Sequence, residues 1–315
     1  MREHSDRSSG ATLWAIVLAG GEGVRLRPLV REMCGDERPK QFAKIVGSKS
    51  LLRHTLDRVG LKILPRQTVI VTCRAHEKYM AQEPTDGYGH RVLVQPEDRG
   101  TAAGVLFPAH WINSQDPNAI VAIFPSDHYI IEASLFMSHI VSLAGFVLQQ
   151  PDRLVLVGAP ADTPETEYGW IEPGETLGRI GSVPVLQVKR FWEKPSEPQA
   201  RVCLAGGCLW NTLVIVAKLS TLLDAGQRLL PELTTRVARA ASRVAVDGGL
   251  DIDHDYSLAP KADFSRMILQ ASPPLLAVST PSELTWSDLG TPPRVRQALR
   301  MVASSGALRE GALVG

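Results

Sequence analysis

The stretch LWAIVLAGGEGVRLRP (residues 13–28) joins an apolar run to a glycine-rich, basic segment. Residues 13–18 predict a buried β-strand, because six consecutive apolar residues leave no polar face for solvent. Gly20, Gly21 and Gly23 follow this run. Glycine has no Cβ atom, so backbone N–H groups in such a loop can converge closely on an anion. The stretch therefore predicts a strand that ends in an anion-binding loop.

Further apolar runs alternate with helix-like segments along the first half of the chain. Strands are predicted at 68–73, 91–96, 119–128 and 153–159, and helices at 50–59, 100–112 and 134–150. Ser50 stands where it can cap the first of these helices. Such alternation is typical of an α/β fold. We expect a Rossmann-like three-layer αβα domain with a mostly parallel mixed sheet, whose active site lies at the carboxyl ends of the strands.

The regular alternation of strands and helices ends after residue 160. The segments YGWIEPG (168–174) and VPVLQVKRFWEKP (183–195) predict two strands joined by a turn at GETLGRIGS (174–182). We expect helices near 197–204, 218–225, 231–245 and 293–303, and strands at 208–217 and 274–280. The polar segment 248–265 is expected to be irregular.

Composition excludes several classes of protein. The chain has 34 basic and 33 acidic residues, and this balance argues against a protein that coats nucleic acid. No apolar stretch approaches the length of a membrane span, and the polar segment 1–10 lacks the apolar core of a secretory signal. Cys34, Cys73, Cys203 and Cys208 are expected to be reduced thiols and not zinc ligands. A cytoplasmic protein is the expectation.

Basic residues crowd the segment after the glycine loop. Arg25, Arg27, Arg31, Arg38 and Lys40 lie within sixteen residues of one another. The glycine spacing fits neither the dinucleotide pattern G-x-G-x-x-G nor the P-loop pattern that ends in G-K-[ST]. Arginine offers a planar fork to phosphate oxygens, and lysine offers a movable point charge. These residues therefore favour a phosphate-binding loop over a plain solvated turn.

The segment GGEGVRLRPL (20–29) followed by RPKQF (38–42) resembles the signature of the sugar-1-phosphate nucleotidyltransferases. The PKQF form, with GSKSLLRHTLDRV (47–59) after it, is similar to bacterial mannose-1-phosphate guanylyltransferases. Further family motifs follow in order: QPEDRGTAAG (95–104), FPSDH (124–128), ETEYGWIEPG (165–174), FWEKP (191–195), WNT (210–212) and WSDLGT (286–291). The resemblance spans residues 14 to about 292.

The resemblance implies transfer of a nucleotidyl group from GTP to mannose-1-phosphate, which gives GDP-mannose and pyrophosphate and uses Mg²⁺. Two polyanions must meet in this reaction, so positioning and charge neutralisation carry most of the catalysis. We expect a tail at 1–12, a catalytic domain at 13–292 with a sugar-side lobe at about 160–265, and a C-terminal helix and tail at 293–315. The expected partners are these two small molecules, without nucleic acid or membrane, and a homodimer is possible.

The same resemblance implies roles for individual residues. The catalytic set would be Arg25, Lys40, Asp127 and Lys194, and Arg25 and Lys40 would hold the triphosphate. The other nucleotide-binding residues would be Ala19, Gly20, Gly21, Gly23, Glu97, Arg99, Gly100 and Thr101. The sugar phosphate would meet Gly169, Glu193, Lys194 and Asn211. Asp127 and Asp288 would hold the metal ion, and His128 would have a supporting role.

Some positions depart from the family pattern. Gly100 replaces a common asparagine, Ile268 stands where a glutamate is expected near the sugar hydroxyls, and Leu213 adds bulk after WNT. Trp170 and Trp210 fit either a sugar-ring contact or a plain core role.

Other functions stay open. The same chemistry with another base or sugar is one, and PKQF argues against the thymidylyl and uridylyl enzymes. A second is a non-catalytic regulatory homologue that binds a sugar nucleotide, which the presence of all five phosphate and metal residues disfavours. A third is a glycosyltransferase, which normally shows D-x-D at a strand end. The triplet DID (251–253) lies in a polar segment.

Overall fold

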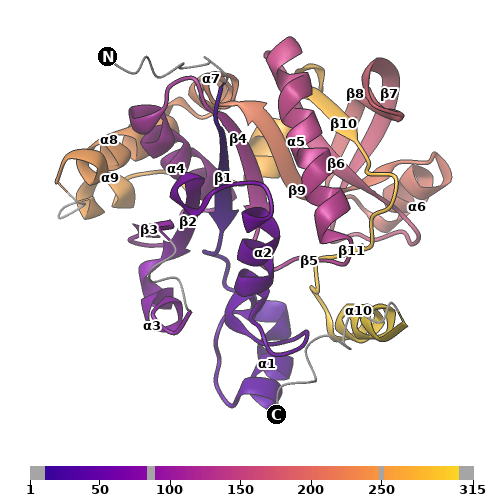
Figure 1. The fold of residues 1–315 in the computed structure, drawn as a ribbon, viewed down its shortest axis with the longest axis horizontal. Coiled ribbons are helices and arrows are strands. Elements are labelled where there is room, and N and C mark those ends of the chain that lie inside the picture. The colour runs from indigo at the N-terminus through magenta and orange to yellow at the C-terminus, as the bar shows by residue number, and fades with distance from the viewer. Residues whose placement is uncertain (1–10, 84–88, 248–251, 305–315) are drawn as a thin grey trace, which may run out of the picture.

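The computed structural model describes residues 11–83, 89–247 and 252–304. Its centre is one nine-stranded sheet with the order β3-β2-β1-β4-β9-β6-β10-β8-β7 (Figure 1). The strands are β1 (Leu13–Leu18), β2 (Thr68–Cys73), β3 (Arg91–Gln95), β4 (Ile120–Pro125), β6 (Leu154–Pro160), β7 (Gly169–Ile180), β8 (Val183–Glu193), β9 (Leu209–Lys218) and β10 (Leu276–Ser279).

The sheet is mixed and mostly parallel, as the sequence predicts. Strand β1 pairs in parallel with β2 and β4, and β2 pairs in parallel with β3. Strand β9 lies antiparallel between β4 and β6, and β8 lies antiparallel to β10 and β7. Only β8 and β9 run against the other strands of this sheet in the described chain. The strands of residues 160–265 thus belong to the same sheet as the N-terminal half.

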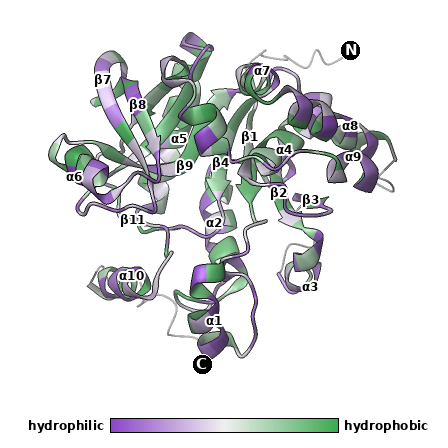
Figure 2. Ribbon diagram, turned by 180° about the vertical axis from the view of Figure 1, so that it is seen from behind, coloured by the Kyte–Doolittle hydropathy of each residue, from purple (hydrophilic) through white to green (hydrophobic). Residues whose placement is uncertain are grey.

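Helices cover both faces of the sheet, which gives the expected three layers. Helices α4 (Thr101–Gln115), α7 (Leu219–Leu229) and α8 (Pro231–Asp247) pack on one face, with apolar side chains that include Phe107 and Leu222. Helices α2 (Leu51–Gly60) and α5 (Ala133–Gln149) pack on the other. The central strands are hydrophobic between these layers (Figure 2). The remaining helices are α1 (Arg27–Cys34), α3 (Glu77–Met80), α6 (Glu197–Ala205), α9 (Asp253–Ser257) and α10 (Pro292–Ser304).

Local sequence signals explain where several elements begin. The Ser50 side chain accepts a 3.0 Å hydrogen bond from the Arg53 backbone N–H and caps α2, as predicted. Strand β1 begins at Leu13, and the Gly20–Gly23 loop follows its end. The four cysteines are free thiols, as expected, and three of them are buried. Within the described ranges, the model contains no helix with both the length and the apolar character that crossing a membrane requires.

Two predictions are wrong. Strand β7 continues to Ile180, so the chain turns at Gly181 and Ser182 and not over the whole of residues 174–182. The glycines in that segment relieve crowding inside the strand: a Cβ atom on Gly178 would lie 2.9 Å from the Phe146 ring. Part of the segment expected to be irregular forms α9, which the fully buried Tyr256 anchors to the core. Residues 1–10 of the expected tail and residues 248–251, with part of DID, lie outside the described residues.

Candidate active site

A two-stranded sheet joins two loops that are far apart in the sequence. Strand β5 (Tyr129–Ile130) pairs antiparallel with β11 (Trp286–Ser287). Asp127 and His128 immediately precede β5, and Asp288 immediately follows β11. The pairing therefore brings the two aspartates predicted from the sequence into one place, at the carboxyl end of β4.

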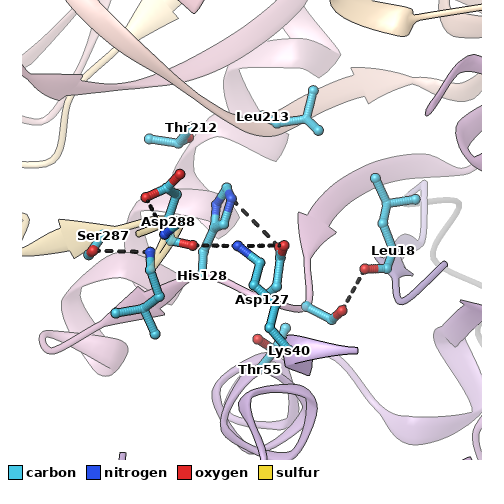
Figure 3. Close-up of polar contacts among 12 residues, drawn as sticks. Leu18, Lys40, Thr55, Asp127, His128, Thr212, Leu213, Ser287 and Asp288 are labelled. Carbon is cyan, nitrogen blue, oxygen red and sulfur yellow. Dashed lines mark hydrogen bonds and ion pairs between the residues drawn. The ribbon is translucent and has the colours of Figure 1, made fainter. Parts of the chain in front are cut away.

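Lys40 joins these two loops (Figure 3). Its Nζ lies 3.0 Å from Oδ2 of Asp127 and donates a 2.7 Å hydrogen bond to the backbone carbonyl of Asp288. The Lys40 side chain is 9% exposed, whereas that of Asp127 is 28% exposed and reaches the surface of the site. The ion pair is thus largely shielded from solvent on the lysine side and open on the aspartate side.

The surroundings keep Asp127 ionised and His128 neutral. Burial opposes ionisation of Asp127, but the charge of Lys40 and its hydrogen bond to the carboxylate outweigh burial and hold the pKa of Asp127 below its ordinary value. Burial lowers the pKa of His128, and Lys40 adds to this effect against the opposing pull of Asp127. The Trp286 indole donates to His128 Nδ1 at 3.3 Å, so the proton of the neutral ring is on Nε2, 3.7 Å from Asp127 Oδ1. His128 therefore lies beside Asp127 as a neutral ring, and its supporting role stays a prediction.

The Asp288 carboxylate points away from Asp127 (Figure 3). Its Oδ1 accepts hydrogen bonds from the Tyr168 hydroxyl at 2.7 Å and the Gly290 backbone N–H at 2.9 Å. Arg294 NH1 lies 3.2 Å from Oδ1 and 3.1 Å from Oδ2. Burial opposes ionisation, but Lys40 and Arg294 hold the pKa of Asp288 below its ordinary value. The sequence motifs contain Tyr168, but nothing in the sequence marks Arg294 as a partner of Asp288.

The glycine loop closes one side of a cavity of about 370 Å³. A Cβ atom on Gly20 would lie 2.9 Å from Gln95 Nε2, at the end of a side chain. One on Gly23, where φ is +60°, would lie 3.0 Å from the Lys40 backbone nitrogen, so this position needs glycine. The Gln41 side chain donates to the carbonyls of Ala19 and Gly21 at 3.0 and 2.9 Å. Gln41 is buried, and these two hydrogen bonds fix the conformation of the loop. Sequence reasoning missed this role.

Four of the predicted nucleotide-binding residues line this cavity: Gly20, Gly21, Gly100 and Thr101. Gly100 has a φ of +83°, and a Cβ atom there would lie 2.3 Å from the carbonyl oxygen of Ala262. This contact explains why the asparagine common in the family cannot be accommodated. Ala262 is among the lining residues that sequence reasoning missed, with Leu18, Glu22, Val71, Gln95, Asp98, Gly104, Lys261 and Asp263.

Four predicted residues are not among the described residues that line the cavity: Ala19, Gly23, Glu97 and Arg99. Ala19 and Gly23 shape the loop itself. Arg99 pairs with Glu97 at 2.7 Å and also donates to the Ser257 carbonyl. Glu97 lines a separate, open hollow beside Arg74. The cavity is thus lined by three glycines and the threonine of the predicted set but not by its charged pair.

The predicted sugar-binding residues converge on one face of the sheet. Gly169 of β7 pairs with Glu193 of β8, and a Cβ atom on Gly169 would lie 3.0 Å from Glu193 Oε2 and 3.1 Å from Asn211 Cβ. Burial and the nearby Asp263 raise the pKa of Glu193 to about 7. Asp263 also lines the 370 Å³ cavity, so this cluster lies close to the cavity's edge.

Two predicted cations lie at the exposed rim of this region. Arg25 pairs with Glu167 at 2.9 Å, and both side chains are about half exposed. Lys194 is exposed and has a φ of +50°, and its backbone N–H donates to the Tyr168 carbonyl at 3.2 Å. A positive φ is strained for a residue with a side chain, and such strain is concentrated at functional sites.

The opposite face of β7 and β9 is aromatic. Side chains alternate across a strand, so Trp170 and Trp210, which pair with each other, point away from Gly169 and Asn211. They pack with Tyr168 in a core cluster. Trp170 is fully buried and so has the core role, whereas Trp210 also lines a second cavity, of about 620 Å³. Ile268 is fully buried in the main core.

The donors at this site suit a hard divalent cation in part. Within the described ranges, no three or more His, Cys, Asp or Glu side chains are grouped so that they could hold a metal ion. Mg²⁺ is usually held by one or two carboxylates together with substrate phosphates and water. Asp127 fits this pattern because its carboxylate is ionised and partly exposed. The Asp288 carboxylate is close by but held by Tyr168 and Arg294.

Residues 14–305 match the family model described as nucleotidyl transferase. The chain is 28% identical over 281 residues to the alginate biosynthesis protein AlgA of Pseudomonas syringae, which covers 87% of the chain and 56% of that protein. It is 26% identical over 288 residues to a mannose-1-phosphate guanylyltransferase of Klebsiella pneumoniae, which covers 89% and 58%. The chain thus spans little more than half the length of these curated relatives.

Solved structures support the fold. A structure described as mannose-1-phosphate geranyltransferase from Thermus thermophilus matches with a TM-score of 0.72 and 28% identity, over 89% of this chain and 76% of that one. A structure described as a putative glucose-1-phosphate thymidylyltransferase from Bacillus anthracis matches with a TM-score of 0.58 and 15% identity, over 92% and 95%. The second likeness concerns the fold alone.

Proposed function

The chain belongs to the nucleotidyl transferase family, and on this premise we propose that it transfers a nucleotidyl group from a nucleoside triphosphate to a sugar-1-phosphate. An oxygen of the sugar phosphate attacks the α-phosphorus of the triphosphate. The bond between that phosphorus and the oxygen bridging to the β-phosphate breaks, and pyrophosphate leaves. We propose GTP and mannose-1-phosphate as the substrates, which gives GDP-mannose.

The observation that carries this proposal is the position of Lys40 between Asp127 and the backbone of Asp288. The lysine ammonium is a point charge suited to phosphate oxygens. Lys40 also lies next to Gly23, at the end of the glycine loop. Two unit charges 4 Å apart attract by about 4 kcal/mol at an effective dielectric near 20. A partly shielded ammonium can therefore offset much of the repulsion between two phosphorylated reactants.

The nucleotide has a matching cavity. The 370 Å³ hollow beside Gly20 and Gly21 has an apolar wall from Leu18 and Val71 and polar groups from Gln95 and Asp98. Such a combination suits a flat base that needs apolar contact and a few directed hydrogen bonds. In this pose the triphosphate extends along the glycine loop toward Lys40.

The sugar phosphate is assigned to the cluster at the edge of this cavity. Glu193 would accept hydrogen bonds from sugar hydroxyls. Gly169 leaves room for the Glu193 carboxylate, because a Cβ atom at position 169 would lie 3.0 Å from its Oε2. Lys194 follows directly and would hold the phosphate of the incoming sugar. The ring and the attacking phosphate are thereby held toward Lys40 and Asp127.

The site suits Mg²⁺ in part: Asp127 would be the primary carboxylate, and Asp288, whose carboxylate Tyr168 and Arg294 hold, would be the second. When bound, the ion would neutralise charge on the phosphate oxygens as the bond changes partners. Lys40 keeps Asp127 ionised, and the neutral His128 ring lies beside its carboxylate, with Nε2 3.7 Å from Oδ1.

The choice of GTP and mannose-1-phosphate draws on the sequence motifs and on the name of the Klebsiella relative. A screen of pyrophosphate release, with four nucleoside triphosphates against several sugar-1-phosphates, tests it. We expect the fastest release with GTP and mannose-1-phosphate. A clear preference for another pair would contradict the choice of substrates, and no release with any pair would contradict the reaction. The cytoplasmic location and the homodimer remain predictions.

A further inference from the structure

Arg294 is a largely buried cation that the proposed phosphate-binding set does not include. It lies in the first turns of α10, and its side chain is 12% exposed. NH1 lies against the Asp288 carboxylate, NH2 donates to Glu165, and the guanidinium carbon lies 4.2 Å from the centre of the Tyr168 ring. These contacts on three sides fix the guanidinium beside Asp288.

The two oxygens of Asp288 differ in what holds them. Oδ1 accepts from the Tyr168 hydroxyl, the Gly290 backbone N–H and Arg294. At Oδ2, the contact that the described residues make is with Arg294, at 3.1 Å. An ionised carboxylate offers about four lone-pair sites. Oδ2 therefore has a lone pair left for a second positively charged partner, beside the one that faces the Arg294 guanidinium.

We propose that Arg294 competes with the divalent cation for the Asp288 carboxylate and so sets the affinity of the site for that cation. This inference rests on the proposed function, in which Asp288 is the second carboxylate of the metal site. In this inference Arg294 acts through Asp288, so it is a positioning residue. Its positive charge and its contact with Oδ2 both work against a dication at the same oxygen.

Removal of Arg294 is expected to free Oδ2 without releasing the carboxylate. The Tyr168 hydroxyl, whose hydrogen bond to Oδ1 is 2.7 Å long, remains a donor. The Gly290 N–H remains as well. Glu165 is expected to have the opposite effect, because its carboxylate pairs with the other guanidinium nitrogen, NH2, and so shares the positive charge of Arg294 with Asp288. Loss of its charge should leave Arg294 more firmly on the carboxylate.

Mn²⁺ binding in the presence of inorganic pyrophosphate tests this inference without any turnover. Free Mn²⁺ is followed by electron paramagnetic resonance for the full-length chain, Arg294→Gln, Arg294→Lys and Glu165→Gln. The matched control is Arg296→Gln, because Arg296 is an exposed arginine on the same helix. We expect Arg294→Gln to lower the Kd for Mn²⁺ about three- to tenfold. Arg294→Lys and Arg296→Gln should stay close to the wild type, and Glu165→Gln should raise the Kd.

The outcomes separate this inference from the proposed function. If the wild type binds Mn²⁺ with pyrophosphate but Arg294→Gln binds it equally or more weakly, Arg294 does not compete for Asp288 and the inference alone fails. If the wild type binds no Mn²⁺ with pyrophosphate, the proposed function fails and the inference fails with it. Should Arg294→Gln not fold, Glu165→Gln decides: an unchanged or lower Kd in that variant overturns the inference.

Discussion

The Nζ of Lys40 lies 3.0 Å from Oδ2 of Asp127, and the lysine side chain is almost fully buried in that position. Eighty-six residues separate the two in the sequence, so the contact is a product of the fold. The contact explains why Asp127 stays ionised although burial opposes its ionisation.

Lys40→Met should lower kcat by about two to three orders of magnitude, because a preorganised positive charge beside the phosphates is lost. It should also destabilise the protein by about 1–3 kcal/mol, since Asp127 loses its buried partner. Pyrophosphate release and thermal unfolding measure the two effects. Lys44→Met is the control, because Lys44 is an exposed lysine on the same segment. Equal kinetics for the two variants would show that Lys40 has no catalytic role.

Lys194→Met should raise the KM for the sugar phosphate by about tenfold to a hundredfold, which is what the loss of one charge-assisted hydrogen bond costs. The KM for the nucleotide should change little, because Lys194 lies on the sugar side. Lys189→Met serves as the control, since Lys189 is exposed on the same strand β8. A larger effect on the KM for the nucleotide than on the KM for the sugar phosphate would contradict the assignment of Lys194 to the sugar phosphate.

Gly100→Ala should destabilise the protein by about 1–3 kcal/mol, because alanine is strained at this positive φ. The clash of its Cβ with the Ala262 carbonyl should destabilise the protein further. It should also raise the KM for the nucleotide, because Gly100 lines the cavity. Gly35→Ala separates the two causes of instability: Gly35 has a similar φ of +77°, but a Cβ atom there would meet nothing within 4 Å. If both variants unfold at the same temperature, the contact with Ala262 contributes nothing.

Binding of the sugar phosphate should depend on pH through Glu193. Burial and Asp263 raise the pKa of Glu193 to about 7. Below this value the side chain is neutral and accepts hydrogen bonds poorly. Above it the carboxylate accepts them from sugar hydroxyls, so the KM for the sugar phosphate should fall between about pH 6 and about pH 8. Glu193→Gln should remove most of this dependence and leave only that of the substrate phosphate. A pH profile identical to the wild type would exclude Glu193 as the titrating group.

The sequence predicts the parts of the fold and site that depend on local pattern. Buried parallel strands read as continuous apolar runs, so β1, β2, β4 and β6 were all predictable. The positions of Lys40, Asp127 and Asp288 followed from motifs at strand ends. Their convergence follows from the rule that such loops meet at one edge of the sheet.

Other features depend on contacts between distant segments. Ala262 approaches Gly100 from 162 residues away in the sequence, and no local pattern at either position announces this contact. The same holds for Arg294, which reaches Tyr168 and Asp288 from a helix whose apolar spacing indicated only that it packs. The turn after β7 was misplaced because glycines that relieve crowding inside a strand look the same as glycines that form a turn.

The central claim, nucleotidyl transfer at the Lys40–Asp127 pair, is tested most directly in the reverse direction. GDP-mannose is incubated with labelled pyrophosphate and Mg²⁺, and the nucleotides are separated. The wild type and Asp152→Asn, whose exposed carboxylate lies outside the site, should convert the label into GTP and release mannose-1-phosphate. Asp127→Asn should slow this exchange by about two orders of magnitude or more. Undiminished exchange in Asp127→Asn, or no labelled triphosphate from GDP-mannose or any other nucleotide sugar, would contradict the account.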